Sequence, residues 1–441
     1  MKGMMHVAVI AGNEFPYLKT ERQKSMTAEN AFGISRKSFL GGSLAMFAAA
    51  GASAAAAPAK KIQGFDETNA GKLATQAWTP FSEKKVRVGI AGEGYCSFGS
   101  AFGYQNHPNV EVVACTDLDA GRCKLLQERV KAPKTYPSCE EMIKHAGEDK
   151  LDAVYIATDA ASHVRLAIMA LEHGLNVATA VPAFLGKDQL EFVPRLLDAV
   201  KRSGKVYQMN ETTAFRASCY AIRKLYEAGK LGAITYTEGE YFHPGSNNIT
   251  DISNNNSYNG WRYGLPPQYY PTHSNGYYTC VTHKRFVKVS CTGIPSLKYK
   301  YAKGNAYNNP YGSEYAMFTC EDGSAARMLV SWDVPSYGGE DGRIWGQKGC
   351  YVPEKGGYRG WFDDEVKKMA IAKPQLPPGM PAGGHGGSHG YLTDDFIRSI
   401  LLPGHTPCVD VKTALDTTIA GVYAHLSAMK GGETLAVPAV V

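Results

Sequence analysis

The chain has 441 residues, 44% of them hydrophobic and 20% charged. At roughly 150 residues per domain, this length predicts two or three domains with buried cores. The composition excludes disordered, collagen-like and coiled-coil proteins. The formal net charge is +6, but it is unevenly distributed, and this changes what it indicates.

Residues 1–60 predict a signal peptide. They hold seven Lys or Arg and three Glu, a surplus of four positive charges that leaves only +2 for the rest of the chain. That remainder is too small to predict nucleic-acid binding. Arg36 and Lys37 precede a run of Gly, Ala, Leu, Met and Phe that ends in small residues, the pattern of a cleavable signal. The run is short and weakly hydrophobic for a membrane anchor.

Residues 35–40 resemble a twin-arginine export signal with Lys at the second arginine position; an ordinary Sec signal is the alternative. We therefore expect an exported, periplasmic protein without a membrane anchor in its mature form. Disulfides can form in that compartment. The ten Cys residues include no CxxC pair, so we expect no zinc site and mostly buried free thiols.

The segment after the leader predicts a βαβ unit. Strand 86–91 runs into Gly92-Glu-Gly94, a helix opens near Ser97, and strand 110–116 ends at Asp117. Gly92 permits a tight turn, Gly94 lets the backbone approach a pyrophosphate, and the helix N-terminus faces its charge. Ser97 occupies the third glycine position. Asp117 is placed to bind ribose hydroxyls and to repel a 2′-phosphate, which favours NAD over NADP.

The alternation continues with strands at 151–157, 175–179 and 206–210 and helices that include 187–203. It predicts a Rossmann-type, doubly wound parallel sheet over residues 84–210. Ligands bind at the carboxyl ends of such strands. The residues predicted to contact NAD are Gly92, Gly94, Tyr95, Cys96, Ser97, Asp117, Thr158, His163, Val181, Pro182, Asn210 and Glu211.

Residues 211–441 predict a substrate-binding α+β domain with an open, mostly antiparallel sheet. Strands are expected at 233–243, 286–291, 315–320, 325–330 and 342–347, and helices at 217–232, 390–401 and 411–430. The last helix can pack back on the first domain. The Asn- and Ser-rich segment 244–260 is either a surface loop or part of a sugar site.

His385 and His389 have the i, i+4 spacing of helical metal pairs. Glycines surround them and disfavour a helix. We therefore expect a flexible loop near the substrate and no metal.

Residues 84 to about 435 resemble the Gfo/Idh/MocA oxidoreductase family. The resemblance is carried by the 86–94 opening, Asp117, the 154–158 phrase with His163, and residues 170–177. Members usually carry Glu-Lys-Pro after the 175–179 strand, with the lysine aiding hydride transfer. Here the triplet is Ala180-Val181-Pro182. The resemblance therefore implies NAD and a carbohydrate, but not the usual alcohol-oxidising lysine.

The glycoside hydrolase family 109 branch also lacks this lysine, and Val181-Pro182-Ala183 is similar to its version of the segment. Trp261-Arg262 and the 270–273 Tyr-Pro-Thr-His phrase resemble that branch as well. The resemblance implies Tyr270 and His273 as catalytic residues, with Trp261 and Arg262 binding substrate. A second tyrosine of the branch is missing, since Ala214 and Phe215 stand there, so its N-acetylgalactosaminide specificity is not implied.

The branch implies redox-neutral glycoside hydrolysis: transient oxidation of the sugar 3-hydroxyl, elimination, water addition and re-reduction, with NAD held tightly. Tight binding suits an exported enzyme, which meets little free NAD. Two alternatives stay open: a sugar or polyol dehydrogenase with net hydride transfer, and a non-catalytic sugar-binding protein. We expect a homo-oligomer, because the open sheets of this family often pair.

Overall fold

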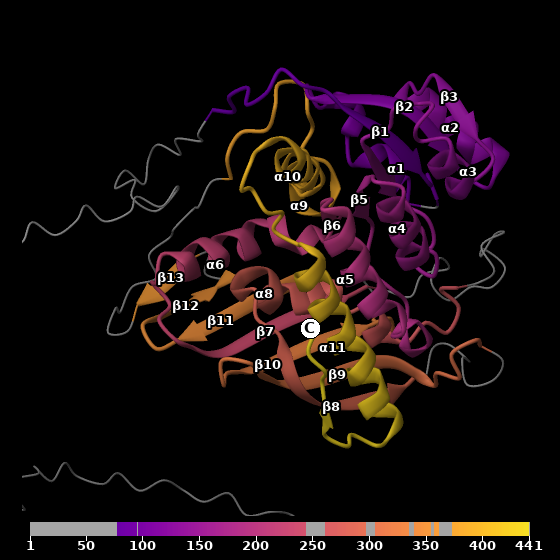
Figure 1. Ribbon diagram of the computed structural model, residues 1–441. Helices are drawn as coiled ribbons and strands as arrows, with labels where there is room; N and C mark the ends of the chain where they lie inside the picture. The colour runs from indigo at the N-terminus through magenta and orange to yellow at the C-terminus, as the bar shows by residue number, and fades with distance from the viewer. Residues whose placement is uncertain are drawn as a thin grey trace, which may run out of the picture. The chain divides into compact units, whose positions relative to one another are not determined.

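The computed structural model describes residues 77–94, 96–243, 261–296, 305–334, 339–353, 357–360 and 373–440. Two sheets with their covering helices account for these ranges (Figure 1). The predicted signal peptide, Tyr95 and the 244–260 segment lie outside the described residues.

The first sheet is parallel throughout, with the order β3-β2-β1-β4-β5-β6. The predicted doubly wound fold is confirmed. The order reverses between β1 and β4, so a crevice opens where these strands end. The strands are β1 (Val86–Ala91), β2 (Val110–Thr116), β3 (Lys134–Tyr136), β4 (Ala153–Ile156), β5 (Asn176–Thr179) and β6 (Tyr207–Met209).

The helix predicted at 187–203 is interrupted. A 3₁₀ turn, η2 (Lys187–Gln189), precedes α5 (Phe192–Ser203). Pro194 explains the late start, because a residue without an N–H is tolerated only in the first turn of a helix. The other helices of this half are α1 (Phe98–Ala101), α2 (Ala120–Val130), α3 (Cys139–Lys144) and α4 (His163–Glu172), with the 3₁₀ turn η1 (Tyr104–Asn106).

The second sheet has the order β13-β12-β11-β7-β10-β9-β8-β14. Its pairs are antiparallel except β7 with β10, which confirms the predicted mostly antiparallel sheet. The strands are β7 (Ile234–Phe242), β8 (Phe286–Pro295), β9 (Tyr311–Cys320), β10 (Ala325–Ser331), β11 (Gly339–Gly346), β12 (Gly349–Val352), β13 (Gly357–Gly360) and β14 (Leu435–Ala436).

Helices α6 (Ala217–Glu227), α8 (Thr272–Thr282) and α11 (Val411–Met429) pack against this sheet (Figure 1). Helix α11 also contacts β6 and α5 of the first sheet. The 3₁₀ turn η3 (Thr212–Phe215) follows the first sheet, and η4 (Pro267–Tyr269) lies between β7 and β8 in the chain. Helix α9 (Gly384–Gly387) precedes α10 (His389–Leu401).

Helix α8 was not predicted from the sequence, because its residues show no amphipathic pattern. All eleven of them are buried. Two of its polar side chains hydrogen-bond to α11: Thr279 shares a 2.7 Å hydrogen bond with the hydroxyl of Thr417, and Asn275 donates to the Thr417 carbonyl. The helix lies so close to β7 that a Cβ at Gly239 would stand 2.1 Å from the carbonyl oxygen of Ser274.

All ten cysteines are described, all are free and six are buried, as expected from the sequence. Among the described helices, none combines the length and apolar character needed to cross a membrane.

We predict that Gly239→Ala displaces α8 and destabilises the protein by about 1–3 kcal/mol, the usual result of overpacking. Denaturant unfolding measures the free energy. Gly147→Ala is the matched control, because a Cβ at Gly147 meets no atom within 4 Å. Equal stability of the two variants would show that α8 tolerates displacement from β7.

Candidate active site

A cavity of about 530 Å³ joins the carboxyl ends of the parallel strands to residues of the second sheet and its helices. Its lining contains both groups of residues singled out from the sequence. Those of the nucleotide half are Gly92, Gly94, Cys96, Asp117 and Thr158, and those of the second half are Trp261, Arg262, Tyr270 and His273.

The turn after β1 has the form expected of a dinucleotide cradle. Gly92 has φ +92°, and a Cβ there would lie 2.6 Å from the carbonyl oxygen of Ala157. Close packing of the following helix depends on Gly99, whose Cβ would stand 2.4 Å from the Gly92 carbonyl oxygen. Gly99 therefore performs the packing role assigned to the third glycine position, which the sequence reasoning placed at Ser97. Ser97 instead accepts a 2.9 Å hydrogen bond from Arg129.

Asp117, at the end of β2, organises this turn. Its carboxylate accepts hydrogen bonds from the backbone N–H groups of Glu93 (3.0 Å) and Gly94 (3.1 Å). Arg122 lies with Nε 3.3 Å from the other carboxylate oxygen and also lines the cavity. Asp117 thus binds the turn and faces the cavity at the same time.

The remaining predicted cofactor residues are buried and are not among the residues that line the cavity within the described ranges. His163 connects the ends of two strands: Nδ1 is 2.8 Å from the carbonyl oxygen of Pro182 and Nε2 is 3.2 Å from that of Thr158. Val181 precedes Pro182 through a cis peptide bond. Asn210 accepts a 2.7 Å hydrogen bond from Gln208.

Aromatic and basic side chains surround the other end of the cavity. The guanidinium of Arg262 lies 4.3 Å from the ring centre of Trp261 and 5.6 Å from that of Tyr270. Burial raises the pKa of Tyr270 to about 12, with Arg262 opposing the shift. Tyr270 is therefore a neutral hydrogen-bond donor at neutral pH. Tyr241, His243 and His385 complete this end.

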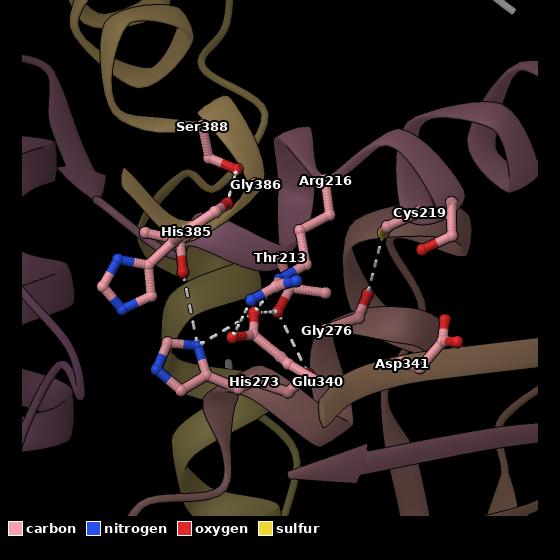
Figure 2. Close-up of polar contacts among 12 residues, drawn as sticks. Thr213, Arg216, Cys219, His273, Gly276, Glu340, Asp341, His385, Gly386 and Ser388 are labelled. Atoms are coloured by element: carbon pink, nitrogen blue, oxygen red, sulfur yellow. Dashed lines mark hydrogen bonds and ion pairs between the residues drawn. The ribbon is translucent and has the colours of Figure 1, made fainter. Parts of the chain in front are cut away.

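His273 stands in the first turn of α8 and belongs to a group of four ionisable side chains. Glu211, His273 and Glu340 are buried, and Arg216 is partly exposed. Figure 2 shows His273 with Glu340 and Arg216. Its Nδ1 lies 2.8 Å from Oε1 of Glu211 and 3.6 Å from Oε1 of Glu340. Arg216 lies with Nε 2.6 Å from Oε1 of Glu340 and donates from Nη2 to Oε2 at 2.6 Å. The hydroxyl of Thr213 also donates to Glu340.

This arrangement favours the imidazolium form of His273. Burial by itself would lower the pKa of His273, but the negative charges of Glu211 and Glu340 raise it above its ordinary value. Burial would correspondingly raise the pKa of Glu211, yet attraction to His273 brings it below the usual value. Glu211 and His273 thus favour the charged form of each other.

Glu211, His273 and Glu340 also satisfy the spacing of a metal site, with ligand atoms within 4.8 Å of one another. Arg216 occupies the position of a cation beside Glu340. A divalent ion in the same cluster would meet that fixed positive charge, so the donor set suits a proton on His273 better than a metal.

Several of these residues were not assigned a role from the sequence. Glu340 lies in β11, 67 positions after His273, with no local motif around it. Arg216 and Arg122 carry no distinguishing spacing, although a basic residue in the first turn of the helix after Asp117 could have been noted. Glu211 was expected at the cofactor, whereas here its carboxylate hydrogen-bonds to His273.

The fold and the glycine turn are those of a dinucleotide-binding domain. Residues 86–211 match the Gfo/Idh/MocA family model, described as an oxidoreductase family with an NAD-binding Rossmann fold. The resemblance inferred from the sequence is confirmed over this part of the chain.

The chain is similar to several curated relatives. It is 32% identical over 178 residues to a glycosyl hydrolase family 109 protein of Porphyromonas gingivalis, covering 39% of this chain and 37% of that one. It is 27% identical over 201 residues to an alpha-N-acetylgalactosaminidase of Bacteroides fragilis, covering 43% and 47%. The aligned part thus spans between about a third and a half of these relatives.

Solved structures share the fold over a longer stretch. Scyllo-inositol dehydrogenase from Lactobacillus casei, solved with NAD(H) and scyllo-inositol, has a TM-score of 0.61 at 18% identity, covering 80% of this chain and 99% of that one. An NAD-binding oxidoreductase from Klebsiella pneumoniae has a TM-score of 0.64 at 13% identity, with 80% and 99% coverage.

The residues present fit NAD. The space above Gly92 is closed to any Cβ, the cavity passes Gly94 and Asp117, and its far end reaches Tyr270 and His273.

We predict that Asp117→Asn weakens NAD binding about 10–100-fold, the usual range for losing a hydrogen bond to a charged group. It should also reduce the preference over NADP. Calorimetric titration of both nucleotides measures this, with Glu111→Gln, at an exposed ion pair with Arg87, as control. Unchanged affinities would show that Asp117 serves the turn alone.

We also predict that Glu211→Gln lowers the pKa of His273, because it removes the closer of two negative charges. If His273 acts as the charged acid, activity is lost as pH rises through its pKa, so the basic limb of the pH profile moves to lower pH. Histidine NMR titration and the pH profile measure both effects. Glu321→Gln, at an exposed ion pair with Arg285, is the control; a His273 signal that titrates alike in both variants would contradict the charge group.

Proposed function

We propose that this protein is an NAD-containing enzyme that cleaves a glycosidic bond without net oxidation. The observation that carries the proposal is the juxtaposition of Tyr270 and His273 at the end of the cavity that begins at the glycine turn, with Glu211 2.8 Å from His273. The absence of a lysine at the Ala180-Val181-Pro182 segment supports it, because simple alcohol oxidation in this family uses that lysine.

In the proposed reaction the sugar carries a transient ketone at carbon 3, which acidifies the hydrogen on carbon 2. The substituent at carbon 1 then leaves, and water adds in its place. When bound, NAD supplies the hydride acceptor for the first step and the hydride donor for the last. The residues of this chain must bind the sugar, orient it and move protons.

His273 and Tyr270 suit different tasks. The imidazolium of His273 can protonate the departing oxygen. Glu211 and Glu340 favour the protonated form of His273 until the departing oxygen, a stronger base than water, accepts the proton. Tyr270 stays neutral and can donate a hydrogen bond to a sugar oxygen. Trp261 and the guanidinium of Arg262 offer a flat apolar face and fixed donors, a combination that suits a sugar ring.

The proposal includes tight retention of NAD, export to the periplasm and association of identical subunits. Because the bound NAD is returned to its oxidised state in each turnover, it need not be replaced from solution. This property suits a compartment with little free NAD, and a signal of the twin-arginine type would permit export of the folded, loaded protein. The exposed side chains of Ile294, Tyr315 and Met317 on β8 and β9 support pairing of the open sheet.

The decisive measurement is release of nitrophenol from a panel of p-nitrophenyl glycosides by the purified protein, with NADH followed at the same time. We expect nitrophenol without accumulation of NADH, and Tyr270→Phe should lower kcat about 10²–10⁴-fold. Tyr423→Phe, on the C-terminal helix away from the cavity lining, is the control. Steady NADH formation from a free sugar would instead identify a dehydrogenase, and neither product would favour a sugar-binding protein.

A further inference from the structure

His385 lies in the same cavity as His273 but belongs to a segment more than 100 residues later in the sequence. The centres of the two imidazole rings are 6.1 Å apart and their planes differ by 24°. Figure 2 shows the rings next to each other, with Glu340 and Arg216 on the other side of His273. A substrate that reaches His273 therefore also meets His385.

We propose that His385 is the base that removes the proton from carbon 2 of the sugar, opposite His273 as the acid. The inference rests on the proposed function. It assigns to His385 the proton transfer from carbon 2, for which Tyr270, a neutral donor, and a protonated His273 are both unsuited.

The hydrogen bonds of His385 leave one ring nitrogen for this task. Its Nδ1 lies 3.0 Å from Nε2 of His389, so His385 Nε2 is the nitrogen left for a substrate. His389 Nδ1 in turn lies 3.3 Å from the carbonyl oxygen of Ala101, and the ring stacks on Phe102 with centres 4.2 Å apart. His389 Nδ1 also lies 3.3 Å from the backbone N–H of Gly384, so the tautomer of His389 sets that of His385. The proposed base requires the tautomer in which Nδ1–H of His389 is directed at Ala101: its Nε2 then accepts the Nδ1 proton of His385, and Nε2 of His385 carries a free lone pair.

The backbone that carries His385 is held in place. His385 has φ 51° and ψ 54°, a left-handed conformation that is unfavourable for a residue with a side chain, and such conformations gather at functional sites. The ammonium of Lys373 donates to the carbonyl oxygens of Phe215 at 2.8 Å and of Gly387 at 2.9 Å. Ser388 donates to the carbonyl of His385 at 2.8 Å. The segment expected to be a flexible loop is thus fixed at several points.

The charges around the two histidines differ in sign. His385 faces His273 from α8, Arg216 from the end of η3 and His389 from α10, with Glu340 of β11 as the acidic neighbour. Burial, followed by the charge of His273, lowers the pKa of His385 to about 4. The neighbouring carboxylates of Glu211 and Glu340 raise the pKa of His273. Neighbouring groups whose pKa values are driven apart are the usual form of an acid–base pair.

The step balances without further reactants. The bond from carbon 2 to hydrogen breaks and the proton moves to Nε2 of His385. The electron pair forms the double bond between carbons 1 and 2, and the bond from carbon 1 to oxygen breaks with its pair on the leaving oxygen. That oxygen takes the proton of His273. His273 loses one positive charge and His385 gains one, so the total charge of the two histidines stays the same.

A p-nitrophenyl 3-keto-glycoside tests the step directly, because this probe already carries the ketone and requires no hydride transfer. We expect the wild-type protein to release nitrophenol, and His385→Asn and His385→Gln to be slower by about 100-fold or more. His173→Asn, an exposed histidine at the end of α4, is the control and should behave as the wild type. Unchanged NAD affinity in both His385 variants will show that they fold.

The outcomes separate the inference from the function. His385 variants within about threefold of the wild type would overturn the role of His385 as the base. A wild-type protein that leaves both the ketone probe and ordinary p-nitrophenyl glycosides intact would overturn the proposed function itself.

Discussion

The candidate site depends on one set of charge pairings, which joins the buried side chains of Glu211, His273 and Glu340 to Arg216. Removing two carboxylates from water is costly, and the cost is offset only if cations and hydrogen bonds meet them at close range. The four side chains come from the chain segments around η3, from α8 and from β11. These pairings therefore hold the helix under the cavity against the sheet, and the two carboxylates raise the pKa of His273.

Helix α8 can pack this close to the sheet because the strands beneath it carry glycines at the points of contact. Gly239 on β7 and Gly342 on β11 lie under it, and a side chain at either would collide with the helix. Asn275 and Thr279 inside α8 form hydrogen bonds with Thr417 of α11. The site is thus held by packing at its base and by charge at its surface, while the glycine turn and Asp117 form the opposite end of the same cavity.

Much of the nucleotide half was predictable from the sequence. Strands of buried apolar residues, the Gly92 and Gly94 turn and the terminal Asp117 are local patterns, and a doubly wound sheet follows from their alternation. Exceptions were also local in cause: Pro194 delays α5, and Gly99 rather than position 97 packs against Gly92. The second sheet was anticipated in its class, though its short strands β12, β13 and β14 have too few residues to show a period.

The site of the second half was predictable only in part. Tyr270, His273, Trp261 and Arg262 were identified through resemblance, and all line the cavity. Their chemical state could not be inferred from the sequence, because Glu340 and Arg216 meet His273 only after the chain has folded. Likewise, the glycines around His385 indicated freedom, whereas Lys373 and Ser388 hold that segment in one conformation.

By itself, the sequence determined what is encoded in neighbouring residues: the parallel sheet, the dinucleotide turn and the residue types available for chemistry. Only the tertiary structure decided which histidine lies beside carboxylates and which lies beside cations. The reason is physical, since a strand or turn is specified by contacts over a few residues, whereas a pKa depends on burial and on every charge within a few ångströms, whatever its position in the chain.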